Sequence, residues 1–320
     1  MTRLFSIINV TRSRRLVKHV LEGTLGYRVN WEISKRKVQF QNWARRTKVS
    51  NKQKKWNLAK AKGQTLDICV EGGGVLRLNT DSALGRAIYC EDFELNERTF
   101  AWRYLQQGDL FVDIGANIGL YSVIAAKRVG ERGQVIAFEP AKLARQRLKE
   151  NIQLNNFSNV NIESFALSDR EGTSDIHVPY DGYDAWSSMA MPIDGSDIRV
   201  ETIVTTSWDT FARKIGDIVP TMMKIDVEGW ECRVLDGASS MLVSGNAPLL
   251  QVEFTDEAAT AAGSSCTDLY YSLQGFGYTI CRYDKSLNQL IPDQLRSQYP
   301  YDNLFATKCL EKDNTRLENS

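Results

Sequence analysis

Strand-like and helix-like segments alternate along this chain from residue 110 onwards. The first apolar run, at residues 110–114, precedes a helical pattern with Leu120, Val123 and Ile124 on one face. Further strand patterns follow at residues 135–138, 160–165, 222–225 and 249–254, and helical patterns separate most of them. Parallel strands are joined by right-handed helical crossovers of this kind. The pattern therefore predicts an α/β fold, a parallel sheet with helices on both of its faces.

Four parts of the chain differ in composition. Residues 1–63 hold seventeen Lys or Arg against Glu22 and Glu32, and we expect them to form a basic N-terminal extension. Residues 64–105 are predicted to be a small entry module, a hairpin followed by a helix, because strand-like alternation meets a run of three glycines there. Residues 106–310 form the predicted main domain, and residues 311–320 have the composition of a polar tail.

The turn after the first predicted strand has the residues of a ligand-binding loop. Gly115 and Gly119 allow a tight turn that brings the backbone close to a ligand, at the start of a helix. The spacing is not the GxGxxG of dinucleotide-binding proteins, because the middle glycine is absent. Asp113, at the end of the strand, suits a cationic group such as the amino group of a methionine moiety. We assign Asn117, within the turn, to the same site.

Two later strand ends complete a candidate cofactor site. Glu139 follows the second strand, where an acidic side chain can accept hydrogen bonds from both hydroxyls of a ribose. The turn after the third strand is positioned to form an adenine pocket through backbone groups and polar side chains, and it consists of Ala166, Leu167, Ser168 and Asp169. Together these residues predict S-adenosylmethionine as the ligand.

Four stretches of the chain resemble the signature blocks of the FkbM-type methyltransferase family. They are VDIGANIGLYS, IAFEP, FALSD and MKIDVEGWE, and the resemblance covers roughly residues 95–285. It implies a Rossmann-like class I methyltransferase fold and an S-adenosylmethionine-dependent enzyme that methylates oxygen on sugars or natural products. Trp208 and Asp209 stand where the family commonly has Leu-Asp, and the basic extension lies outside the resemblance.

Carboxylates follow the fourth and fifth predicted strands, beside the expected cofactor crevice. Asp226 and Glu228 are the candidate catalytic residues, because removal of the proton from an acceptor hydroxyl needs a base. A purely structural alternative is helix capping by Asp226, with Glu228 in the first helical turn. Asp226 and Glu253 are also candidate ligands of Mg²⁺, which would activate the acceptor oxygen as a Lewis acid.

The acceptor and the partners are less constrained by the residues. An insertion at residues 172–207 contains Tyr180, Tyr183 and Trp186, which suit the apolar face of a saccharide as well as they suit a surface loop. We expect a small-molecule or saccharide acceptor. A lipid-linked acceptor is one alternative within this expectation. Residues 1–63 are the candidate contact with an anionic membrane, and nucleic acid is the least favoured partner.

The six cysteines form no CxxC pair, and no apolar stretch approaches the length of a membrane span, so the expected location is the cytoplasm, with or without peripheral contact at the inner membrane face. Two other functions remain open on the residues alone. One is a nicotinamide-dependent dehydrogenase on a similar fold. The other is a non-enzymatic nucleotide-binding or adaptor module that uses the basic extension.

Overall fold

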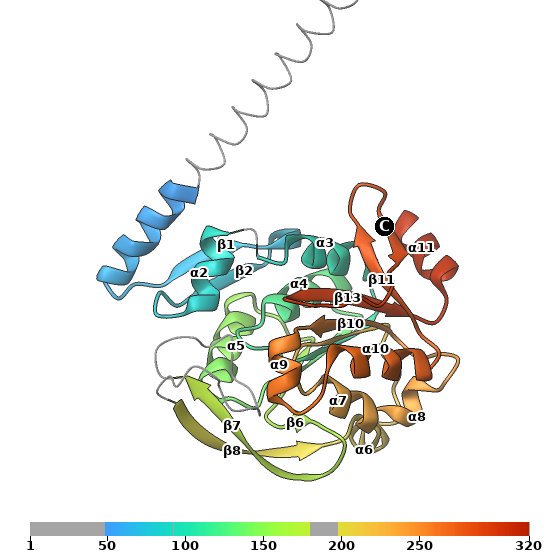
Figure 1. The fold of residues 1–320 in the computed structure, drawn as a ribbon. Coiled ribbons are helices and arrows are strands. Elements are labelled where there is room, and N and C mark those ends of the chain that lie inside the picture. Colours follow the sequence, from blue (N-terminus) through green and yellow to red (C-terminus); the bar gives the residue numbers. More distant parts are fainter. Residues whose placement is uncertain (1–48, 92, 180–197, 320) are drawn as a thin grey trace, which may run out of the picture. The chain divides into compact units, whose positions relative to one another are not determined.

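An eight-stranded sheet lies at the centre of residues 56–320 (Figure 1). The computed structural model describes residues 49–91, 93–179 and 198–319 of the chain. The chain divides into two units, residues 1–55 and residues 56–320. Of the first unit only residues 49–55 are described, and they are helical. The predicted basic extension therefore lies largely outside the described residues, whereas the sheet belongs to the second unit.

Five parallel strands and three antiparallel strands make up this sheet. The parallel strands are, in spatial order, β5 (Val160–Glu163), β4 (Gln134–Phe138), β3 (Leu110–Ile114), β9 (Met222–Ile225) and β10 (Leu249–Phe254). The antiparallel strands continue from β10 as β13 (Asp302–Thr307), β11 (Thr279–Asp284) and β12 (Gln289–Pro292). The chain runs outward from β3 to β5 and then returns to β9 on the other side of β3. Ligands of such sheets bind at the carboxyl ends of the strands where the direction of winding changes, here between β3 and β9.

Both faces of the sheet are buried, because successive residues of each strand enter different hydrophobic cores. Phe111 and Met222 pack in one core, whereas their neighbours Val112 and Met223 pack in the other. The first face is covered by α3 (Leu95–Tyr104), α4 (Leu120–Val129) and α5 (Lys142–Leu154). The second is covered by α6 (Trp208–Lys214), α7 (Glu231–Gly237), α8 (Ser239–Leu242), α9 (Asp256–Ala261) and α10 (Cys266–Gly275). Figure 1 shows α4 and α10 on opposite sides of the sheet. The predicted Rossmann-like fold, with helices on both faces, is confirmed.

The entry segment packs on the first face. It comprises β1 (Leu66–Cys69), a short 3-10 turn η1 (Glu71–Gly73), β2 (Val75–Leu78), α2 (Ala83–Cys90) and α3. Trp56, which the sequence places in the basic extension, is only 2% exposed, and its ring lies 5.7 Å from the ring of Tyr89. The second unit begins at Trp56, and the burial of this side chain agrees with that division.

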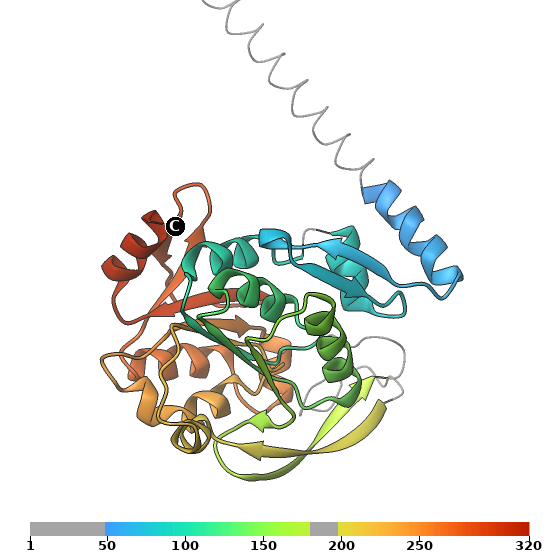
Figure 2. The same ribbon diagram turned by 180° about the vertical axis from the view of Figure 1, so that it is seen from behind.

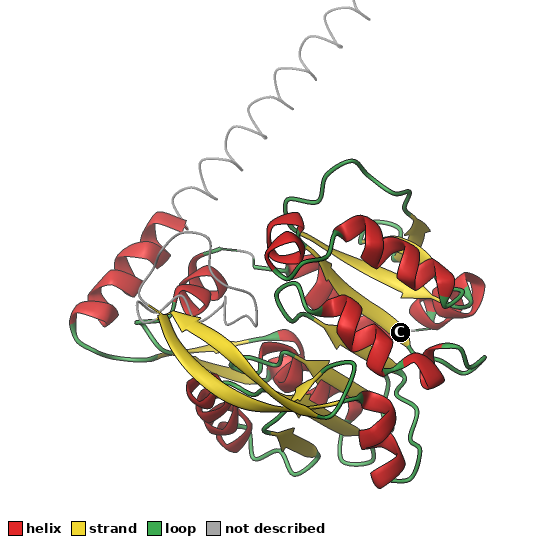
Figure 3. Cartoon of the chain, turned by 60° about the horizontal axis from the view of Figure 1, so that its bottom comes forward, coloured by secondary structure: helices red, strands yellow, loops and turns green. Residues whose placement is uncertain are grey.

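The insertion between residues 172 and 207 contains two long strands. β7 (Gly172–Pro179) and β8 (Ile198–Thr206) pair antiparallel, and β8 also pairs with β6 (Ala166–Leu167) in a separate three-stranded sheet. The two strands form the extended ribbon seen from behind in Figure 2 and from below in Figure 3. Tyr180, Tyr183 and Trp186, the candidate saccharide-facing residues, lie outside the described residues.

The last described residues form a helix where the sequence suggests a polar tail. α11 (Leu310–Glu318) buries Leu317 and Asp313, and the Asp313 carboxylate accepts hydrogen bonds from the hydroxyls of Tyr104 (2.6 Å) and Thr307. The sequence of this segment resembles a tail because it is mostly polar, and polar side chains such as Asn314 and Arg316 make many of its contacts with the rest of the protein. Within the described ranges, no helix has both the length and the apolar character that crossing a bilayer requires.

Candidate functional site

The first face of the sheet changes from apolar to polar along each central strand. On β3, β9 and β10 the apolar Phe111, Met222 and Leu249 are followed two residues later by Asp113, Lys224 and Gln251, which are neighbours in register. Residues two apart on a strand share a face, so these polar side chains lie over α4 near the carboxyl ends of the strands. The sheet thus gathers charged groups at the winding reversal, where a ligand is expected.

A pocket opens at these strand ends, and it contains part of each predicted set of site residues. From the cofactor set, Gly115, Asn117, Glu139, Ala166 and Leu167 line it. Asp226, Glu228 and Glu253, the three carboxylates expected at the reacting end, line it as well. Four predicted cofactor residues do not: Asp113, Gly119, Ser168 and Asp169. Both halves of the predicted site therefore share one cavity, which is lined by five of the nine predicted cofactor residues.

Gly115 permits the closest backbone approach in the site. Its φ is +78°, and a Cβ built on it would lie 1.8 Å from the carbonyl oxygen of Asp226. The Gly115 and Ala116 N–H groups donate to the carbonyl oxygen of Phe138, at 3.1 and 3.0 Å. These two hydrogen bonds hold the turn after β3 against the end of β4. The N–H groups of Gly115 and Ala116 therefore bind Phe138 and not a ligand.

Glu139 is held in place by two backbone N–H groups. Its Oε2 accepts from Asn117 and its Oε1 from Ala141, both at 2.8 Å. Burial raises the pKa of Glu139 to about 7, although these two hydrogen bonds and the nearby Arg145 oppose the shift. Each carboxylate oxygen has a second lone pair, so Glu139 can still accept from two hydroxyl groups on a ligand.

Asp113 lies beneath the pocket instead of on its wall. The side chain is 1% exposed, and its Oδ2 accepts a 2.6 Å hydrogen bond from the hydroxyl of Ser122 on α4. Burial raises its pKa, and the neighbouring Lys224 opposes that effect. Asp113 is not among the residues that line the pocket, so the predicted contact with a ligand amino group, directly or through water, stays a prediction. Asp113 influences the pocket through Lys224, because its negative charge raises the pKa of that residue.

The other three residues of the predicted cofactor set also have structural contacts. A Cβ on Gly119 would lie 2.4 Å from Leu148 Cδ1, so this glycine lets α5 pack against α4. Ser168 accepts a hydrogen bond from the indole of Trp230 (3.1 Å), and Asp169 forms an ion pair with Arg233 (3.2 Å). The turn after β6 is thus anchored to α7, and β6 itself contributes Ala166 and Leu167 to the pocket.

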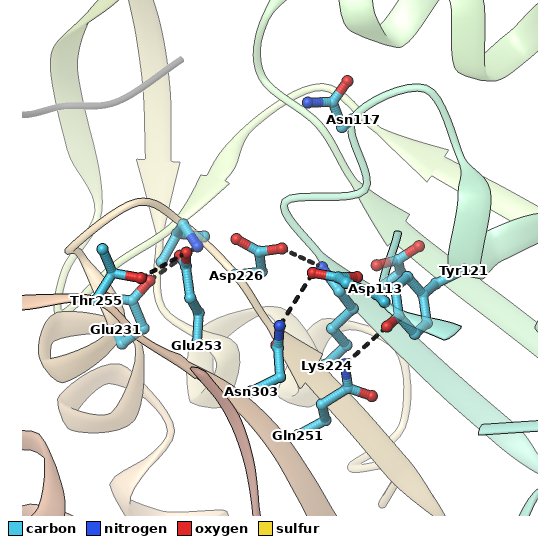
Figure 4. Close-up of polar contacts among 12 residues, drawn as sticks. Asp113, Asn117, Tyr121, Lys224, Asp226, Glu231, Gln251, Glu253, Thr255 and Asn303 are labelled. Atoms are coloured by element: carbon cyan, nitrogen blue, oxygen red, sulfur yellow. Dashed lines mark hydrogen bonds and ion pairs between the residues drawn. The ribbon is translucent and has the colours of Figure 1, made fainter. Parts of the chain in front are cut away.

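Lys224 places a buried ammonium in the middle of the site. The residue is 3% exposed, its Nζ lies 2.7 Å from Asp226 Oδ2, and it stands 4.9 Å from the centre of the Tyr121 ring. Burial acts to lower the pKa of Lys224, but Asp226, Asp113 and Glu94 raise it above its ordinary value. Lys224 therefore stays charged and orients Asp226 (Figure 4).

The loop after β9 does not form the helix cap that the structural alternative for Asp226 predicts. α7 begins only at Glu231, and its N-cap residue is Trp230, so Asp226 does not cap it. Instead, Glu231 Oε1 accepts from the N–H groups of Val227 (2.9 Å) and Gly229 (3.3 Å). Glu228, between them, has a φ of +53°, which is uncommon for a residue with a side chain. The loop is thereby held in a conformation that presents Glu228 to the pocket.

Three carboxylates converge at the reacting end. One carboxylate oxygen from each of Asp226, Glu228 and Glu253 lies within 4.8 Å of the others. Burial, followed by the charge of Asp226, raises the pKa of both Glu228 and Glu253 well above the ordinary glutamate value. Figure 4 shows Asp226 between Glu253 and Lys224. This part of the pocket can accept protons or bind a cation.

Sequence reasoning gave no role to Lys224, and it also missed three residues from distant parts of the chain. Glu94, from the entry segment, lines the pocket together with Tyr301, which precedes β13. The Glu94 carboxylate accepts hydrogen bonds from the Tyr301 hydroxyl and from Asn303 Nδ2, the latter at 3.0 Å. Glu94 also has a left-handed backbone, with a φ of +46°. No local motif marks these residues, because they meet across 207 positions of sequence.

Two characterised proteins share partial similarity with the chain. It is 29% identical over 147 residues to the hexuronic acid methyltransferase AglP of Haloferax volcanii, covering 46% of this chain and 57% of AglP. It is 38% identical over 89 residues to the AMB antimetabolite synthetase AmbE of Pseudomonas aeruginosa, covering 28% of this chain and 4% of AmbE. The matches thus span less than two thirds of either relative.

Among solved structures, the methyltransferase FkbM from Methylobacillus flagellatus is similar at 21% identity and a TM-score of 0.39, over 63% of this chain and 44% of that one. The family described as the Methyltransferase FkbM domain matches residues 113–280, which include the end of β3, the glycine turn, Glu139 and the loop after β9. That range is more than half of the chain, and the resemblance seen in the four sequence blocks is confirmed. The chain belongs to the FkbM methyltransferase family.

Proposed function

We propose that this protein transfers the methyl group of S-adenosylmethionine to a hydroxyl oxygen of a carbohydrate-containing or related small-molecule acceptor. The observation that carries the proposal is the division of one pocket into two unlike halves. One half has Gly115, Glu139 and the apolar wall of Phe138 and Leu167, whereas the other has Asp226, Glu228 and Glu253. A nucleoside fits the first half, and an acceptor hydroxyl fits the second.

The nucleoside half suits the adenosine of the cofactor. Glu139 can accept hydrogen bonds from the two ribose hydroxyls while the N–H groups of Asn117 and Ala141 hold it in place. Ala166, Leu167 and Ile176 offer an apolar surface for the adenine. Gly115 carries no side chain and lines this half of the pocket with its backbone.

The acidic half suits the chemistry of the transfer. When bound, S-adenosylmethionine supplies an electrophilic methyl group on a positively charged sulfur. The acceptor oxygen forms the new bond to carbon, the electrons of the broken carbon–sulfur bond remain on sulfur, and a carboxylate takes the hydroxyl proton. Asp226 is the proposed proton acceptor because Lys224 fixes its orientation. Glu228 lies within reach of the same position.

A sugar acceptor agrees with one of the relatives, because AglP is a hexuronic acid methyltransferase. Lipid linkage of the acceptor and contact of residues 1–63 with an anionic membrane are further parts of the proposal. They are supported by the excess of Lys and Arg in that segment. Family membership leaves the dehydrogenase and adaptor alternatives without support.

The test uses the full chain, methyl-labelled S-adenosylmethionine and a panel of sugars and lipid-linked sugars, with mass spectrometry of the products. We expect label in an O-methyl group of at least one acceptor. Tight binding of NAD without binding of S-adenosylhomocysteine, measured by calorimetry on the same preparation, would overturn the proposal.

A further inference from the structure

The acidic half of the pocket carries more negative charge than its own cation neutralises. Four residues that line this half have carboxylates: Glu94, Asp226, Glu228 and Glu253. Lys224 is the one cationic residue among those that line it, and its Nζ is already paired with Asp226 at 2.7 Å. Carboxylates gathered in a partly buried space repel one another unless protons or another cation neutralise them. The pocket therefore has an excess of negative charge to offer a cationic ligand.

The spacing of three of these carboxylates matches a metal ion. Hard divalent cations bind oxygen at about 2.1 Å for Mg²⁺ and about 2.4 Å for Ca²⁺, so ligands on opposite sides of the ion lie about 4 to 5 Å apart. The ligand oxygens of Asp226, Glu228 and Glu253 lie within 4.8 Å of one another. An ion between them could contact all three with little movement of the side chains.

Glu253 provides a second observation, independent of the clustering. The residue is 4% exposed and lines the pocket, and its Oε1 accepts a 2.9 Å hydrogen bond from the hydroxyl of Thr255. Its Oε2 is fully buried and receives no hydrogen bond from any residue that the structure describes. A buried carboxylate oxygen without a donor is costly, and such oxygens commonly mark a bound ion or water. Glu253 thus presents an unsatisfied ligand atom in the acidic half.

We propose that Asp226, Glu228 and Glu253 bind a hard divalent cation of the Mg²⁺ or Mn²⁺ type. Oxygen-only ligands favour this class of ion over zinc or copper, which prefer nitrogen and sulfur. Lys224 repels the ion, but three carboxylates around the ion outweigh one ammonium already paired with Asp226. The ion would lie beside the expected position of the acceptor hydroxyl and could bind its oxygen. That use rests on the proposed function, whereas binding of the ion does not.

The experiment measures Mn²⁺ binding to the full chain after removal of metals with a chelator, by electron paramagnetic resonance of the free ion. We expect one saturable site, from which Mg²⁺ displaces Mn²⁺. Glu253→Gln keeps the shape of the side chain but removes its charge, and it should weaken Mn²⁺ binding at least about tenfold. Glu171→Gln is the matched control, because Glu171 is an exposed carboxylate that pairs with Lys214 and does not line the pocket.

Calorimetry with S-adenosylhomocysteine on the same samples reports whether each variant retains the cofactor half. If Glu253→Gln fails to fold, Glu228→Gln replaces it, because Glu228 lies in a loop and is less buried. Equal Mn²⁺ affinity in the parent, the folded variant and the control would overturn the metal site, as would the absence of any saturable site. Neither result would affect cofactor binding, so the two proposals fail separately.

Discussion

The carbonyl oxygen of Asp226 occupies the position that the Cβ of any side chain at residue 115 would need, since the two would lie only 1.8 Å apart. The turn after β3 and the loop after β9 are thus in contact through backbone atoms at the winding reversal of the sheet. Because neither backbone can move without disturbing its strand, the cofactor half and the acidic half are fixed to each other at this point.

We predict that Gly115→Ala lowers the free energy of unfolding by at least about 3 kcal/mol, because a clash with backbone is added to an unfavourable φ. Chemical denaturation measures this change. Gly108→Ala is the matched control, since Gly108 also has a positive φ, +90°, but open space around its Cβ position. Similar losses in both variants would show that the contact with Asp226 is unimportant.

Glu139 should make cofactor affinity depend on pH. The ionised carboxylate accepts from ribose hydroxyls better than the protonated form, and its pKa is raised to about 7 by burial, against the influence of Arg145 and with a small contribution from Asp113. We therefore predict that affinity for S-adenosylhomocysteine rises as the pH increases through about 7 and is constant above it. Calorimetry at several pH values measures this.

The same shift has the opposite sign for the stability of the ligand-free protein. Because the folded state binds the Glu139 proton more tightly, this contribution is complete below about pH 4.5 and is lost as the pH rises through about 7.

Glu139→Gln should remove the pH dependence of binding and cost about 1–3 kcal/mol of affinity at pH 8. Unchanged affinity in a folded variant would contradict the ribose assignment.

Asp226→Asn should reduce turnover at least about 100-fold while leaving the fold intact. The amide oxygen of asparagine can still accept the hydrogen bond from Lys224, but it can neither take a proton nor bind a metal ion strongly. Single-turnover assays with saturating cofactor measure the loss. Treatment of the parent protein with a chelator then distinguishes the roles: recovery only on addition of Mg²⁺ indicates a metal, and insensitivity indicates direct proton transfer. Near-normal turnover of the variant would leave Asp226 with a structural role.

Residues 1–48 contain twelve Lys or Arg and should bind anionic membranes at low salt. A chain that begins at residue 49 removes them and keeps Trp56, whose buried ring belongs to the core of the second unit. We expect the full chain, but not the shortened one, to float with anionic vesicles and to be released at high salt. Neutral vesicles are the control. Failure of the full chain to bind even at low salt would exclude membrane docking.

Local patterns predicted the parts of the fold in which sequence neighbours act together. β3, its glycine turn and Glu139 could be found because strand periodicity, turn chemistry and a strand-end acid occur in short blocks. The insertion at residues 172–207 was predicted as a saccharide-facing segment or a surface loop, because β7 and β8 pair mainly with each other and leave Val200 and Val204 exposed. Their strand character comes from pairing, which composition does not reveal.

Burial explains most differences at the site. Asp113 has the chemistry of a ligand contact, but α4 covers it with Ser122, so its position two residues before the turn says nothing about its access. Glu94 shows the opposite case, because it was not predicted from the sequence but lines the pocket. It lies before a helix with no motif around it, and only the folding of β13 beside β10 brings Tyr301 and Asn303 to it.

The pairing of Glu94 with Tyr301 also has a consequence for synthesis of the protein. The residues of the nucleoside half, Gly115 to Leu167, leave the ribosome well before Tyr301, and chains acquire their contacts in the order in which segments emerge. A nascent chain that has not yet released residue 301 lacks one wall of the acidic half. The acidic half is therefore completed only after residue 301 has left the ribosome, and chains released before that residue should carry no methylating activity.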